Sequence, residues 1–66
     1  MTEGNIKRLI WAGFRIFRIS FDGYSVKEAA ITKDGLMWKT AETHKSKKAA
    51  AESYAELIRN EKHLEG

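Results

Sequence analysis

The chain contains no cysteine and no proline among its 66 residues. Without cysteine, neither a disulfide nor a thiolate–metal site can stabilise the fold, so stability depends on packing or on a partner. No apolar run approaches the roughly 20 residues that a membrane span needs, and charges interrupt the first residues where a signal peptide would be apolar. We therefore expect a soluble, cytoplasmic protein with no membrane contact.

The length predicts a single small domain, residues 1–66. A chain of this size buries only about 60% of its unfolded surface, so a homodimer is a plausible way to add buried area. His44 and His63 are the only histidines, and no third ligand stands at a suitable spacing for zinc. An active-site pocket also needs more scaffold than 66 residues usually supply. We expect a non-enzyme without a metal or other cofactor.

The charge balance is mildly basic, with a formal net charge of +3 at pH 7 and a pI near 9.4. Domains that bind DNA or RNA often have such a balance, because Lys and Arg neutralise phosphates. Many proteins without a polyanionic partner share it, so charge alone leaves both classes open.

The first element is predicted to be a short helix over residues 5–12. Asn5 is a competent N-cap, and apolar residues recur from Ile6 at helical spacing. Gly13 would follow the helix, where a positive φ is common. The alternative is a strand that runs from Ile6 into Phe17.

Three strands are predicted next, at residues 14–21, 24–32 and 36–44, with turns at Asp22-Gly23 and at residues 33–35. Short turns imply an antiparallel meander. Phe17 alternates with Ile19 and Phe21, whereas Ile16 falls on the opposite face. This offset predicts either a bulge or burial on both sides near Ile16 and Phe17.

The last predicted element is an amphipathic helix that begins after the N-cap Ser46 and ends near Lys62. It should lie on one face of the sheet. The expected fold is therefore α+β, with a three-stranded antiparallel sheet and the order α-β-β-β-α. Four residues at helical spacing form its expected buried stripe: Ala50, Tyr54, Leu57 and Ile58.

Lysines stand where this helix begins, although the partial positive charge of a helix N-terminus favours acids. An anion bound there would explain them, since free N–H groups and the dipole attract phosphate. Alternatively, three solvated lysines cost only about 0.3–0.5 kcal/mol each when screened. Four cations on the predicted strands would extend this basic surface if they share the sheet face away from the helix, and otherwise they are ordinary solvated residues: Arg15, Arg18, Lys27 and Lys39. The candidate nucleic-acid-binding residues are Lys45, Ser46, Lys47, Lys48, Arg15 and Arg18.

The stretch "KSKKAAAESYAELI" resembles the C-terminal signature of the double-stranded RNA-binding domain, and the resemblance covers residues 24–60. It implies that Ser46 caps the helix and that Lys47 and Lys48 contact phosphates. Ala51 stands where that family has a third lysine, and the loop "FDGYS" lacks the family's histidine. The resemblance therefore implies weak, mostly sequence-independent binding to duplex RNA.

Two further families show similar patterns. The segment "TAETHKSKKAAAESYAELIRN" is similar to the YegP-type small bacterial domain, and the general pattern is similar to the arm-type DNA-binding domain of integrases. Two functions remain: a module that binds duplex RNA or DNA, or a phage or mobile-element protein-interaction module that acts as inhibitor or adaptor. Trp11 and Trp38 could stack on bases, although packing is the commoner role, and an exposed Trp11 would favour a protein partner.

Overall fold

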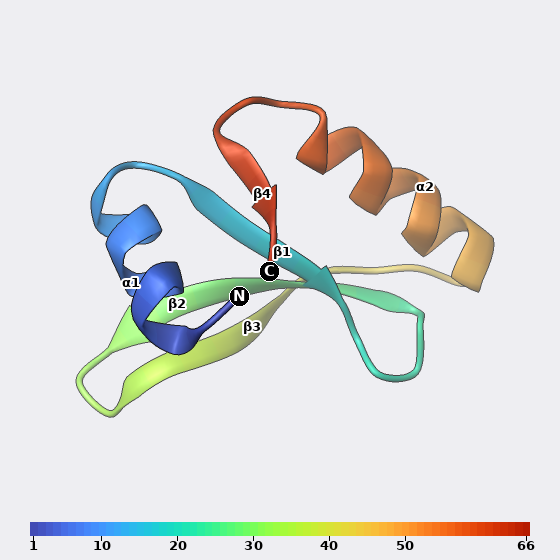
Figure 1. Cartoon of the computed structure of the whole chain (residues 1–66). Helices are drawn as coiled ribbons and strands as arrows, with labels where there is room; N and C mark the ends of the chain where they lie inside the picture. The colour runs from blue at the N-terminus through green and yellow to red at the C-terminus, as the bar shows by residue number, and fades with distance from the viewer.

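The computed structural model describes residues 1–66 and contains two helices and a four-stranded mixed sheet (Figure 1). The α+β class predicted from the sequence is confirmed, but the sheet has one strand more than expected. The elements in chain order are α1 (Glu3–Trp11), β1 (Arg15–Ile19), β2 (Ser25–Thr32), β3 (Gly35–Thr43), α2 (Lys47–Ile58) and β4 (His63–Glu65).

Strands β1, β2 and β3 form the predicted antiparallel meander, and the sheet order is β3-β2-β1-β4. The turn between β1 and β2 contains Gly23 at φ 83°, a left-handed conformation that glycine adopts without strain. A register shift between Val26 and Lys27 places the irregularity in the β2–β3 pair. No bulge lies at Ile16 and Phe17, so burial on both sides is the correct alternative there.

Strand β4 pairs in parallel with β1 and was not expected. The prediction that α2 continues to Lys62 was wrong, because α2 ends at Ile58. Asn60 accounts for the early end: its Oδ1 accepts a hydrogen bond from the Lys62 N–H, and its carbonyl accepts one from His63 N–H. Such local bonds compete with continued helix. The chain then turns back along β1.

The first element is a helix, not a strand, but Asn5 does not cap it. Thr2 is the N-cap, with extended φ/ψ, and its hydroxyl accepts a hydrogen bond from Asn5 N–H at 3.3 Å. Glu3 in the first turn is favourable for the helix dipole. Gly13 follows the helix at φ 96°, as predicted. The helix therefore begins two residues earlier than the sequence suggested.

The two helices pack on opposite faces of the sheet. Adjacent strand residues point to opposite faces, and Ile16 and Phe17 are 0% and 1% exposed. Ile16 packs with Ile6 of α1 and Ala29, which defines the α1 face. The α2 face carries Phe17. The strand register places Glu42 of β3 on the same face, where it accepts a hydrogen bond from α2.

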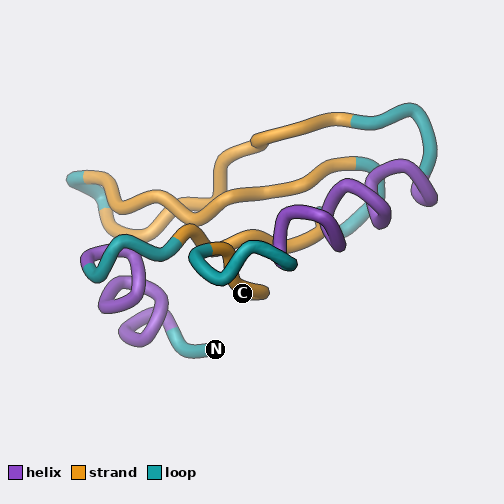
Figure 2. Tube along the Cα trace, turned by 90° about the horizontal axis from the view of Figure 1, so that it is seen from above, coloured by secondary structure: helices purple, strands orange, loops and turns teal.

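Figures 1 and 2 both place α1 and α2 at opposite ends of the sheet. The β1–β2 turn lies at the α2 end, and the β2–β3 turn lies at the α1 end (Figure 1). Because α1 covers only its own end of the α1 face, part of that face is left without a helix.

Candidate nucleic-acid interface

The start of α2 is a capped helix N-terminus surrounded by lysines. Ser46 is extended at φ −139° and ψ 153°, and its Oγ accepts a hydrogen bond from Ala49 N–H at 3.1 Å. The structure therefore confirms Ser46 as the cap. No acidic residue lies in the first turn, whereas Lys47 and Lys48 of that turn and Lys45 just before the cap are all exposed. The local field is positive from both the backbone and the side chains.

Lys47 joins this helix start to the β1–β2 turn. Its Nζ lies 5.9 Å from the centroid of the Tyr24 ring, within the range of a cation–π contact. A Cβ added to Gly23 would lie 3.3 Å from Lys47 Cγ, so the lysine stem runs close to the turn backbone. The turn and the helix start therefore form one continuous surface.

Asp22 is the acidic residue of the β1–β2 turn, and it is engaged locally. Its Oδ1 accepts hydrogen bonds from Ser20 Oγ at 2.6 Å and from Tyr24 N–H at 3.0 Å. These two bonds, followed by the charges of Lys27 and Lys47, hold the pKa of Asp22 below its usual value of 3.8. The carboxylate thus orders the turn and interacts with Lys27 of β2 and Lys47 of α2.

A hydrogen-bonded group anchors α2 to β3 behind the lysines. Glu42 accepts hydrogen bonds from Ser53 of α2 and from His44 Nε2, the latter at 2.9 Å. The bond from Ser53, then that from His44, lowers the pKa of Glu42 from its usual 4.5. His44 precedes Lys45 directly, so this group helps to position the helix start.

The two predicted arginines do not join the α2 lysines. Arg15 lies on the α2 face, where two of its nitrogens donate to the Glu28 carboxylate at 2.9 Å each. That hydrogen-bonded pairing raises the pKa of Arg15 and neutralises its charge locally. Arg18 lies on the opposite, α1 face. The six candidates therefore fall into three groups: Arg15 alone, Arg18 alone, and a cluster of Lys45, Lys47 and Lys48 around Ser46. We call these three residues the α2 lysines.

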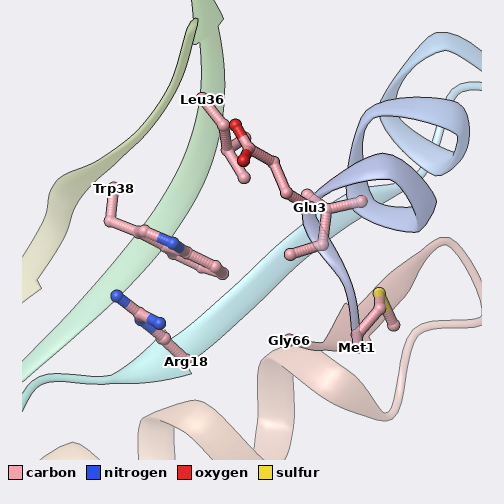
Figure 3. Close-up of a pocket in the computed structure, with 7 residues that line it drawn as sticks. Met1, Glu3, Arg18, Leu36, Trp38 and Gly66 are labelled. Atoms are coloured by element: carbon pink, nitrogen blue, oxygen red, sulfur yellow. The ribbon is translucent and has the colours of Figure 1, made fainter.

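Arg18 lies over Trp38, with its Cζ 4.0 Å from the ring centroid. Figure 3 shows the guanidinium and the indole lying side by side, next to a hollow of about 400 Å³ that Met1, Glu3 and Gly66 also line. On the other side of this pair is a second hollow of about 380 Å³. Phe21 and Lys27 line that second hollow.

Phe21 was not predicted as a site residue, and Lys27 was considered only as a strand cation that could extend the basic surface. Lys27 is the register partner of Arg18, so the two cations lie side by side on the α1 face. Strand alternation could have placed Lys27 there once the pairing of the two strands was known. Phe21 was expected to continue the buried strand pattern, yet it lies in the turn and is fully exposed. Its full exposure follows from the end of β1 at Ile19.

No family model, curated protein or solved structure matches this chain. No three His, Cys, Asp or Glu side chains lie close enough together to hold a metal ion. Neither helix has the length and apolar character that crossing a membrane would require.

Proposed function

We propose that the protein is a small nucleic-acid-binding module that docks phosphates on the start of α2, largely without regard to sequence. One observation carries the proposal: Lys45, Lys47 and Lys48 surround a capped helix N-terminus with no acid in its first turn. The resemblance of residues 24–60 to the double-stranded RNA-binding domain supports the same surface.

The physical basis is that first-turn N–H groups of a helix have no intrahelical partner and point outward. Ser46 Oγ accepts from Ala49 N–H. The N–H groups of Lys47 and Lys48 precede it in the first turn and remain available for an anion. A phosphate there would also reduce the repulsion between three lysines and the helix dipole. The binding contribution is therefore electrostatic and depends strongly on salt.

The test is a salt titration of binding to duplex RNA, duplex DNA and single strands, measured by fluorescence anisotropy. We expect the logarithm of the affinity to fall linearly with the logarithm of salt concentration, with a slope of roughly 0.7–0.9 per phosphate contact. The variant Lys47→Glu/Lys48→Glu should reduce that slope by about two and weaken binding to all three ligands.

A matched control is Arg8→Glu/Lys33→Glu, which makes the same change in net charge at the α1 end of the molecule. Both residues are exposed. Arg8 belongs to α1 and Lys33 to the β2–β3 turn, and Figure 1 shows both of these elements at the end of the sheet away from α2. Circular dichroism should show that both variants stay folded. The proposal is wrong if the wild type binds none of the ligands at low salt, or if both variants weaken binding equally.

A second function, a protein-interaction module, is favoured by Trp11. This residue at the end of α1 is 72% exposed. Large exposed apolar groups often mark protein interfaces. Sedimentation of the wild type and of Trp11→Ser separates this alternative: a dimer lost in the variant would place a second copy on α1.

A further inference from the structure

Part of the α1 face carries no helix and has the composition of a nucleic-acid surface. We call it the open sheet face and define it by Arg18, Phe21, Lys27, Trp38 and Thr40. Register places Arg18 beside Lys27, and Lys27 beside Thr40. The Lys27 Nζ donates to Thr40 Oγ1 at 2.6 Å, which holds the ammonium on this face.

Phe21 is the most unusual member, because a fully exposed phenylalanine ring needs an explanation. It is held in an ordered turn, since Asp22 and Ser20 hydrogen-bond across that turn. The ring borders the hollow of about 380 Å³ whose other side is the Arg18–Trp38 pair. A planar apolar ligand could therefore contact aromatic surface on two sides.

The charged side chains that line this hollow are of one sign. Arg18 and Lys27 line the hollow, and no carboxylate does. The neighbouring hollow on the far side of Trp38 includes Glu3, which makes it less suitable for an anion. Planar stacking surface beside cations fits a nucleobase with its phosphates, because aromatic rings and guanidinium planes stack on unpaired bases.

We infer that the open sheet face binds unpaired bases of a single-stranded nucleic acid, with one base between Phe21 and the Arg18–Trp38 pair. This inference rests on the proposed function, and it names the ligand class as single-stranded. The stem of Lys47 runs along the β1–β2 turn, since a Cβ added to Gly23 would lie 3.3 Å from Lys47 Cγ. A strand that crosses the β1–β2 turn would therefore reach the lysines of α2.

The experiment compares three labelled probes of about 12 nucleotides: oligothymidine, an abasic strand with the same phosphates, and the oligothymidine–oligoadenine duplex. We expect oligothymidine to bind at least about fivefold more tightly than the abasic strand, because each stacked base adds affinity. Phe21→Ala should remove most of that preference and leave abasic binding unchanged. The matched control is Met37→Ala, which truncates an exposed apolar side chain on the α2 face.

A direct reading comes from fluorescence in a Trp11→Phe background, where Trp38 is the remaining tryptophan. Stacking should quench Trp38 when oligothymidine is added but not when the abasic strand is added. Equal binding of all three probes, with no effect of Phe21→Ala, overturns the inference and leaves phosphate docking on α2 intact.

Other results separate the two proposals further. If Phe21→Ala weakens oligothymidine binding but Lys47→Glu/Lys48→Glu does not, the open sheet face is the binding site and docking on α2 is wrong. If no probe binds at low salt, both proposals fail. If Phe21→Ala instead converts a dimer to a monomer without changing probe binding, the face contacts a second copy, which overturns the inference.

Discussion

At the scale of single residues, Ser46 has two separable roles. Its hydroxyl caps α2, and its position at the lysine cluster makes it part of the proposed phosphate site. Ser46→Ala should destabilise the protein by about 0.5–2 kcal/mol, measured by urea unfolding, because Ala49 N–H loses its acceptor. Ser46→Asp should restore the cap and the stability yet weaken nucleic-acid binding, since a carboxylate repels phosphate. If Ser46→Asp binds as tightly as the wild type, phosphate does not dock at this helix start.

Glu42 gives the molecule a pH dependence whose sign follows from its hydrogen bonds. Because Ser53 and His44 lower the pKa of Glu42 in the folded state, the stabilisation is present above the usual value of 4.5 and is lost as pH falls through the folded pKa. Urea midpoints should therefore fall below about pH 4.5 more steeply for the wild type than for Glu42→Gln. Parallel curves for the two proteins would contradict this assignment. Glu52→Gln, an exposed α2 position, is the control.

At the scale of elements, β4 shows what the sequence could not predict. Its three residues contain no repeated apolar pattern, and a short run with one leucine is indistinguishable from a helix end. Its existence depends on long-range contacts: Leu64 packs against the Ile16 cluster, and Gly66 N–H donates to Phe17 carbonyl. By contrast, the meander and the Ser46 cap depend on local turn and capping chemistry, which the sequence carries directly.

The candidate site divides in the same way. The lysines of α2 were predictable because they are adjacent in sequence to a helix start. The open sheet face was not, because Arg18, Lys27 and Trp38 come from three strands and meet only through the observed register. The same register separates Arg15 from Arg18, since alternate strand positions face opposite sides.

Strand β4 should contribute measurably to stability despite its length. Leu64→Ala should cost roughly 1–2 kcal/mol, below the range for fully buried leucines, because Leu64 is only half-buried. Hydrogen exchange should then speed up at two amides. The Gly66 N–H donates to the Phe17 carbonyl of β1, and the Arg15 N–H of β1 donates to the Lys62 carbonyl in the turn before β4. Glu61→Ala, at an exposed position before β4, is the control. Unchanged exchange in Leu64→Ala would show that β4 does not depend on this side chain.

At the scale of the whole molecule, β1 is the shared element of two thin cores. Only six residues are buried, and two of them, Ile16 and Phe17, are neighbours in β1 that face opposite sides of the sheet. A chain of this length is expected to have a total stability of about 3–10 kcal/mol. Neither core is large enough to persist alone, so α1 and α2 should be stable only while β1 holds both.

The two cores should therefore unfold together. Ile16→Ala should cost about 2–5 kcal/mol and Phe17→Ala about 3–5 kcal/mol, each a large part of the total. Two probes should give the same decrease in melting temperature for either change. Circular dichroism reports the helices, and Trp38 fluorescence in the Trp11→Phe background reports the α1 face. Met37→Ala, on an exposed edge position, should change neither. Phe17 contributes only to the α2 face. If Phe17→Ala shows two separate transitions, with the Trp38 signal retained after α2 melts, the α1 face is instead an independently stable unit.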